Sequence, residues 1–469
     1  MADTQTPATY RPDPVYLSLG EGFADAVKPA SFPKHILRWR GDRAAGEVGL
    51  AGLDDTQWVD HFGRFEPLPD NLPEPLALRY HGHQFRVYNP EIGDGRGFLF
   101  AQMRDAAGRL IDLGTKGSGP TPWSRQGDGR LTLKGAVREL LASEMLEALG
   151  VPTSRTFSII ETGESLWRGD EPSPTRSAVL VRMSHGHIRI GTFQRLAYLG
   201  ESARMAQLVR YCLQHYHGHR ADAVAAIDDV MAATTLLRAV VRRTADLAAS
   251  YMIAGFVHGV LNSDNINISG ESFDYGPWRF TQYWDPAFTA AYFDHAGLYA
   301  FGRQPEAIHW DTAQLAIALR TLSPAEPLIA ELERFAGLYQ DAIARRFLWR
   351  IGMESRDAES DQALVAAAER LMMEDRIPID RFFFDWRGGT GPAPDTEAAK
   401  AFTDLASGRE QQHARAHSYW QGAAPESMLI DEVEAIWTAI ADADDWQPLY
   451  AKVARVRAFG EAHRPLAAG

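Results

Sequence analysis

A polar stretch near the middle of the chain carries residue types that can hold a divalent cation. Asp264 and Asn265 end the run that begins at His258, and Asp274 follows shortly afterwards. Oxygen atoms of Asn and Asp are ligands that Mg²⁺ accepts when it bridges the phosphates of a nucleotide. The stretch therefore predicts a metal and nucleotide site, with Asn265 and Asp274 as the metal ligands.

The same stretch lacks the catalytic base of a protein kinase. In kinases that base is an Asp five residues before the metal-binding Asn. The corresponding position here is Val260, and a valine neither accepts a proton nor orients a hydroxyl group. The chain thus has kinase-like metal ligands without a base at the kinase position.

A glycine-rich turn upstream could bind phosphate. Gly93, Gly95 and Arg96 lie between strands predicted over residues 84–88 and 98–103. Glycines at alternate positions let backbone amides converge on an anion, and Arg96 adds a charge-assisted donor. Such a turn is a weak signal by itself, because most glycine-rich turns only connect the strands of a hairpin.

A lysine and a glutamate follow this turn in the order found in the small lobe of protein kinases. Lys116 closes a strand predicted over residues 110–116, and Glu139 lies in an amphipathic helix predicted over residues 131–149. In kinases a Lys–Glu pair in this order positions the phosphates of the nucleotide. We therefore predict that Lys116 pairs with Glu139.

Two other groups of polar residues are weaker candidates. Residues 125–130 form a second polar glycine turn, in which Asp128 could equally be a helix cap or a turn residue. Arg182 and Arg189 would flank the cleft between the two predicted lobes. The planar guanidinium suits phosphate recognition, although a structural ion pair would also explain either arginine.

Length and element order predict an α+β, protein-kinase-like fold with two lobes. A chain of 469 residues exceeds the usual size of one domain. Residues 1–75 are rich in proline and are expected to form an irregular leader that packs on the core. Residues 76–190 are expected to form a small β-rich lobe with one key helix. Residues 191–469 are expected to form a larger helical lobe that carries the metal-binding loop 258–277.

Charge and cysteine content restrict the partners and the location of the protein. The net charge of −13 argues against nucleic acid as the main partner. The single cysteine, Cys212, excludes an intramolecular disulfide bond. The first thirty residues contain no apolar run, and no segment has the length of a membrane span. We therefore expect a soluble cytoplasmic protein that is not a membrane protein.

Taken together, these motifs resemble the selenoprotein O family of kinase-like proteins. The resemblance covers roughly residues 75–320, and the C-terminal region matches less well. The selenocysteine that some members carry has no counterpart in this chain. The segments that carry the resemblance are residues 81–90, 93–97, 116–125, 127–130, 138–139, 187–189, 258–265 and 274–277.

The resemblance implies a specific activity and a set of site residues. Family members bind ATP in an orientation flipped relative to kinases and transfer AMP to Ser, Thr or Tyr hydroxyls of other proteins, releasing pyrophosphate. Asn265 and Asp274 would hold Mg²⁺ or Mn²⁺, Asp264 would be the catalytic base, and Glu139 would pair with Lys116. The residues that would contact ATP are Gly93, Gly95, Arg96, Lys116, Asp128, Gly129, Arg182 and Arg189.

Three functions stay open at this point. The first is a protein adenylyltransferase, of which a UMP-transferring enzyme is a close variant. The second is a conventional phosphotransferase, because His258-Gly259 is similar to a loop of aminoglycoside kinases; Val260 counts against it. The third is a non-catalytic nucleotide-binding scaffold, which the missing base favours and the retained Lys116, Asn265 and Asp274 oppose.

Overall fold

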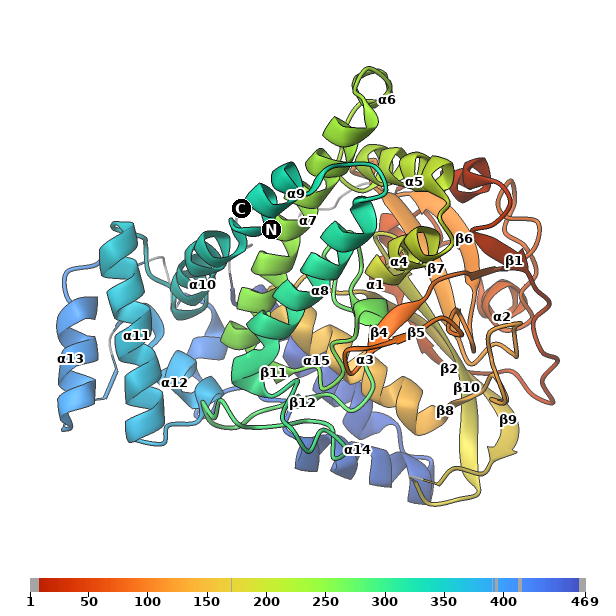
Figure 1. Cartoon of the computed structure of the whole chain (residues 1–469). Helices are drawn as coiled ribbons and strands as arrows, with labels where there is room; N and C mark the ends of the chain where they lie inside the picture. Colours follow the sequence, from red (N-terminus) through yellow and green to blue (C-terminus); the bar gives the residue numbers. More distant parts are fainter. Residues whose placement is uncertain (1–7, 170, 390, 393–394, 412–415, 464–469) are drawn as a thin grey trace.

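A computed structural model describes residues 8–169, 171–389, 391–392, 395–411 and 416–463. An antiparallel sheet occupies the N-terminal part of the chain, and helices dominate the C-terminal part (Figure 1). The predicted α+β class with two lobes is confirmed. None of the described helices combines the length and apolarity that crossing a membrane requires.

The main sheet has eight strands in the order β1-β3-β6-β7-β10-β9-β2, with β8 paired to β10. Its central strand, β7, and the neighbouring β6 are buried along almost their whole length. The strands of this sheet are β1 (Ala24–Ala26), β2 (Ile36–Arg40), β3 (Leu76–Leu78), β6 (Leu99–Arg104), β7 (Leu110–Lys116), β8 (Leu131–Thr132), β9 (Arg155–Leu166) and β10 (Thr175–Ser184).

The proline-rich residues before position 75, for which the sequence predicts irregular structure, contain regular elements. Strands β1 and β2 lie at opposite ends of the main sheet, paired with β3 and β9. Helices α1 (Asp42–Glu47) and α2 (Asp55–Phe62) add Trp58 and Phe62 to the core against the sheet. Local sequence could not reveal these strands, because each is short and depends on a partner far along the chain.

A small hairpin replaces the single strand predicted over residues 84–88. Strands β4 (Gly82–Gln84) and β5 (Val87–Asn89) pair with each other and leave the main sheet. Phe85 and Arg86 form the turn between them, with φ angles of 50° and 63°. The prediction failed because left-handed hairpin turns are recognised in a sequence by glycine or asparagine, and this turn is formed by two bulky residues instead.

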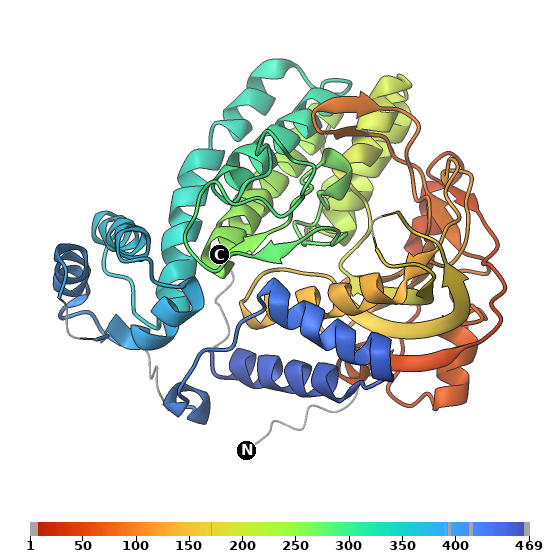
Figure 2. The same cartoon turned by 90° about the horizontal axis from the view of Figure 1, so that it is seen from below.

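Helix α3 (Leu133–Ala148) lies between the sheet and the last two described helices. Its N-cap, Thr132, accepts a hydrogen bond from the Gly135 amide. Helices α14 (Ile430–Ala443) and α15 (Gln447–Glu461) return from the C-terminal part and lie beside α3 (Figure 2). Ion pairs tie them together: Arg457 reaches Glu144 at 2.6 Å and Lys134 reaches Glu434 at 2.7 Å.

The helical part is built around α7 (Asp229–Ala254). Asp228 caps its first turn, and Gly255, with φ of 68°, ends it directly before the polar stretch predicted as the site. Strands β11 (Phe256–Val257) and β12 (Arg279–Phe280) then pair with each other around that stretch. The other helices are α4 (Ile190–Tyr198), α5 (Ser202–His215), α6 (Ala221–Ala225), α8 (Gln304–Leu319), α9 (Ala325–Leu332), α10 (Phe335–Ile351), α11 (Ala358–Glu374), α12 (Ile379–Asp385) and α13 (Glu397–Ala406).

Candidate active site

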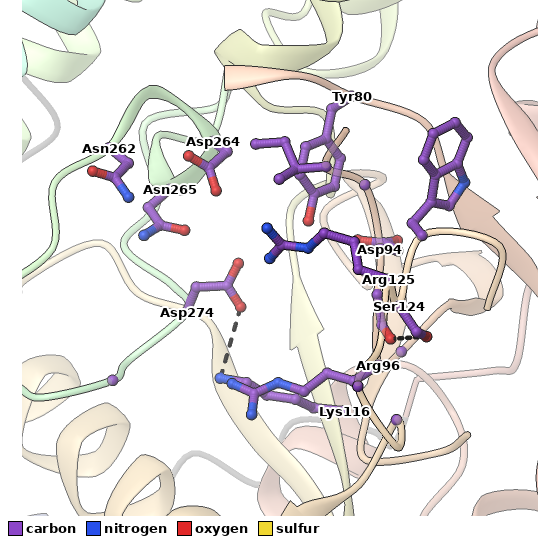
Figure 3. Close-up of a pocket in the computed structure, with 18 of the residues that line it drawn as sticks. Tyr80, Asp94, Arg96, Lys116, Ser124, Arg125, Asn262, Asp264, Asn265 and Asp274 are labelled. Atoms are coloured by element: carbon purple, nitrogen blue, oxygen red, sulfur yellow. Dashed lines mark hydrogen bonds and ion pairs between the residues drawn. The ribbon is translucent and has the colours of Figure 1, made fainter. Parts of the chain in front are cut away.

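A cavity of about 770 Å³ lies where the glycine-rich turn faces the polar stretch. Asn262, Asp264 and Asn265 occupy one side of it, and Asp94 and Arg125 face them from the other side (Figure 3). Of the predicted site residues, all but one line this cavity. They are Gly93, Gly95, Arg96, Lys116, Asp128, Gly129, Arg182, Arg189, Asp264, Asn265 and Asp274. Glu139 is the exception, since it lies behind Lys116.

The glycine-rich turn is held close to the loop that follows β7. The Thr121 hydroxyl donates to the Asp94 carbonyl at 2.5 Å, and the Ser124 hydroxyl donates to the Gly95 carbonyl. A Cβ at position 93 would lie 2.6 Å from the Trp123 ring. The turn is therefore a fixed wall of the cavity. Glycine is needed at position 93 because the Trp123 ring leaves no room for a side chain, and not because of the backbone conformation.

Lys116 and Glu139 form the predicted ion pair. Lys116 Nζ lies 2.6 Å from Glu139 Oε2, and both side chains are buried. Strand β7 supplies the lysine and helix α3 supplies the glutamate. Burial lowers the pKa of the Lys116 amine, while the carboxylate of Glu139 opposes that effect. The pair fixes a cation at the inner end of the cavity.

Asp274 is the centre of a buried charge cluster. Arg182 donates to its Oδ1 and Arg189 donates to its Oδ2 at 2.5 Å, while Lys116 Nζ lies 3.8 Å away. Burial would raise the pKa of Asp274, but the two guanidinium groups and Lys116 hold that pKa well below its usual range. The Asp274 carboxylate is therefore charged, and both arginines bind it in this structure.

Arg189 connects this cluster to both walls of the cavity. Its guanidinium donates to the Asp264 carbonyl at 2.8 Å and lies 3.3 Å from Asp94 Oδ1. The same group stacks over the Tyr80 ring at 4.4 Å. Arg189 precedes helix α4 as its N-cap, so the start of that helix sets the position of the guanidinium.

Asp264, unlike the other acids that line the cavity, forms no ion pair with a described residue. It lies in the 3-10 turn η2 (Ser263–Asn265) and is 8% exposed, and its Oδ1 has no hydrogen-bond partner in the described part of the chain. Burial raises the pKa of Asp264 to about 6, although the Arg189 charge acts in the opposite direction. A carboxylate in this state can accept a proton.

Asn265 is oriented so that its oxygen is available. Its Nδ2 donates to the Val260 carbonyl at 3.0 Å. This hydrogen bond does not involve Oδ1, which can therefore act as a ligand. An amide oxygen beside the Asp274 carboxylate suits a hard cation such as Mg²⁺. No group of three or more His, Cys, Asp or Glu side chains arranged to hold a metal occurs among the described residues.

Asp128 is engaged with another side chain at the edge of the cavity. Its Oδ2 lies 2.9 Å from Arg168, and its Oδ1 accepts the Arg130 amide. Partial burial raises its pKa, but the hydrogen bonds from Arg168 and the Arg130 amide, together with the charges of these two arginines, lower the pKa overall. Its carboxylate therefore fixes the second glycine turn onto the strand β9 side of the site.

Several cavity residues were not predicted from the sequence. Asp94 was present in the glycine-rich turn, but its role as a partner of Arg189 depends on a fold that brings together residues far apart in sequence. Tyr80, Gln84, Trp123, Arg125, Arg168 and Asn262 also line the cavity. Some of them lie within the motifs that carry the family resemblance, which was the only available signal for them.

Comparison with known proteins identifies the family. The family model described as "Protein adenylyltransferase SelO" matches residues 8–457. A protein nucleotidyltransferase YdiU of Synechococcus elongatus is 42% identical over 96% of this chain and 95% of its own length. A protein of the same name from Gloeobacter violaceus is 43% identical over 95% of this chain and 94% of its own. With this match and the kinase-like cavity described above, the chain belongs to the SelO family and is a nucleotidyltransferase.

Proposed function

We propose that the protein transfers AMP from ATP to Ser, Thr or Tyr hydroxyls of other proteins. The observation that carries this proposal is the position of Asp264. It is a buried carboxylate with an unpartnered oxygen, in the same cavity as the cations Lys116, Arg182 and Arg189. A proton acceptor beside a cluster of cations is the combination that attack by a hydroxyl on a nucleotide requires.

In the proposed reaction the acceptor oxygen forms a bond with the α-phosphorus of ATP. The bond between that phosphorus and the oxygen bridging to the β-phosphate breaks, and pyrophosphate leaves. Asp264 accepts the hydroxyl proton, a contribution of typically about 10²–10⁴-fold. The Gly93–Gly97 backbone, Arg96 and Lys116 bind and neutralise the phosphates.

Asn265 and Asp274 would hold Mg²⁺, or Mn²⁺ in its place. A bound cation supplies charge neutralisation at the phosphates. Asp274 is already surrounded by Arg182 and Arg189. A triphosphate offers these arginines alternative acceptors, so we infer that they contact phosphate when the nucleotide and the cation are bound.

Labelled ATP separates this proposal from its two alternatives. The protein is incubated with Mg²⁺, acceptor proteins and ATP labelled at either the α- or the γ-phosphate. Protein-bound label from α-labelled ATP alone is expected. Label from the γ-phosphate alone would identify a conventional phosphotransferase. Transfer of neither label, together with measurable ATP binding, would identify a nucleotide-binding scaffold. UTP labelled at its α-phosphate tests the UMP-transferring variant.

A further inference from the structure

Two exposed aromatic side chains lie near the polar stretch and are called here the aromatic rim. We use this name for Tyr292 and Phe293, in the loop between β12 and α8. This loop passes near the cavity wall: a Cβ on Gly259 would lie 3.0 Å from Pro277, which lines the cavity, and 3.1 Å from Ala290 of the loop. The residues just before the rim therefore lie close to the polar stretch.

The rim is connected to the cavity wall through one further residue. The Phe293 ring packs on Phe85 at the tip of the β4–β5 hairpin, with ring centroids 5.9 Å apart. The Phe85 amide donates to Asn262 Oδ1 at 2.9 Å, and Asn262 lines the cavity two residues before Asp264. The segment from Ala290 to Phe293 thus lies near the polar stretch at Gly259 and, through Phe85, at Asn262.

The loop that carries the rim is held by buried hydrogen bonds. Both oxygens of the buried Asp294 accept backbone amides, from Leu298 and Tyr299, each at 2.8 Å. The Tyr299 hydroxyl donates to Asn262 Oδ1 at 2.7 Å. The rim is consequently a built feature with a defined position relative to Asn262, rather than the tip of an unanchored loop.

The rim exposes apolar area with little charge around it. Tyr292 is 80% exposed and Phe293 is 42% exposed, and their rings meet edge to face at 5.1 Å. Nearby charges on the hairpin and α8 neutralise each other, since Arg86 pairs with Glu306 at 3.0 Å. Aromatic side chains left in water beside a cavity are typical of a surface that binds a partner.

We propose that the aromatic rim docks the protein substrate by binding an apolar side chain that neighbours the acceptor hydroxyl. This inference rests on the proposed function, because it assumes an acceptor that is part of a polypeptide. We assume that the peptide is extended where it presents the acceptor side chain to the cavity. Each further residue then lies about 3.3 Å along the peptide, so the residues next to the acceptor lie within several ångströms of it. Phe293 is connected to the cavity-lining Asn262 through Phe85, and the exposed Tyr292 packs on Phe293.

Two matched sets of short peptides test the proposal. Each peptide has one central Ser, Thr or Tyr, and the flanking positions carry Leu in one set and Gln in the other. AMP transfer from α-labelled ATP is measured with the wild-type protein and with Tyr292→Ser, Tyr292→Phe and Ile329→Ser. Ile329 is a matched control because it is 50% exposed, lies on α9 and does not line the cavity.

The wild-type protein is expected to prefer the Leu set by about tenfold in kcat/KM, the effect of one buried apolar contact. Tyr292→Ser should remove this preference by raising the KM for the Leu peptides, with the KM for ATP unchanged. Tyr292→Phe and Ile329→Ser should keep the preference. The same preference in wild type and Tyr292→Ser would overturn the docking role of the rim but not the proposed function. Loss of the preference in Tyr292→Phe to the same extent as in Tyr292→Ser would have the same consequence. No AMP transfer to either set would overturn the proposed function and the rim with it.

Discussion

Gly82 lies directly against Asp264: a Cβ added at position 82 would come within 2.9 Å of Asp264 Cβ and 3.0 Å of its Oδ1. The β4–β5 hairpin is further bound to the same turn by the His83 amide, which donates to Ser263 Oγ at 2.7 Å. The backbone of a hairpin near the start of the fold therefore sets the position of the proposed base.

This contact predicts the effect of Gly82→Ala. The added methyl group must displace Asp264, so AMP transfer should fall by about 10-fold or more, as small displacements of catalytic groups do. ATP binding should be unchanged within about twofold, since Gly82 does not line the cavity. Initial rates and calorimetric titration measure the two quantities. Gly46→Ala is the control because a Cβ there meets no atom within 4 Å; full activity of Gly82→Ala would show that the contact is tolerated.

Removing the proposed base should separate chemistry from binding. We expect Asp264→Ala to reduce transfer by about 10²–10⁴-fold and to leave the dissociation constant for ATP nearly unchanged. The side chain has an unpartnered buried oxygen, so its loss should not destabilise the fold. Single-turnover rates and thermal unfolding measure these effects. An unaltered rate would assign Asp264 a structural role.

Asp274→Ala should affect both activity and stability. The substitution removes one proposed metal ligand and leaves Arg182 and Arg189 buried without their main counter-charge. Removal of one member of a buried ion cluster typically costs about 3–5 kcal/mol of unfolding free energy. Urea denaturation in the absence of nucleotide tests the stability effect, and labelled ATP tests the activity. Asp285→Ala, at an exposed acid of the same segment, is the control and should retain both. Full transfer by Asp274→Ala would exclude it as a metal ligand.

The Lys116–Glu139 pair should show strong energetic coupling. Lys116→Met leaves Glu139 buried without its closest cation, and Glu139→Gln does the reverse. The double substitution should therefore lower the free energy of unfolding by less than the sum of the two single substitutions. We expect a coupling free energy of about 1–3 kcal/mol in a double-mutant cycle of urea unfolding. Additive effects would contradict a tight buried pair.

Buried histidine should make the protein less stable in acid. His463 is 7% exposed and lies among Trp349, Trp420 and Phe459. Burial, with Arg387 nearby, lowers its pKa to about 3. The unfolded chain binds a proton at His463 near pH 6.5, so between pH 6.5 and about 3 it binds more protons than the folded protein does.

The unfolding free energy should therefore decrease as pH falls through that interval, by at most about 1.4 kcal/mol per pH unit from this residue. The measurement is urea unfolding at several pH values for wild type and His463→Phe. The variant should have a shallower slope over the same interval. Identical slopes would show that His463 does not contribute.

Sequence alone determined the parts of this protein that depend on local pattern and residue order. Alternation and spacing of apolar residues predicted strand β7 and helix α3, because each pattern repeats over several turns or pleats. The order of the glycine-rich turn, Lys116, Glu139 and the polar stretch identified the family that the comparisons confirm.

Only the tertiary structure decided which of these groups bind one another. It brought Arg182 and Arg189 to Asp274, seated the β4–β5 hairpin on Asp264, and laid α14 and α15 along α3. These contacts join residues that are about 80 to 300 positions apart, as the separations of 85 for Arg189–Asp274 and 300 for Lys134–Glu434 illustrate. Local periodicity reports which face of an element is buried, but it carries no information about which distant element will cover that face. Burial then raised the pKa of Asp264, whereas Arg182, Arg189 and Lys116 lowered the pKa of Asp274.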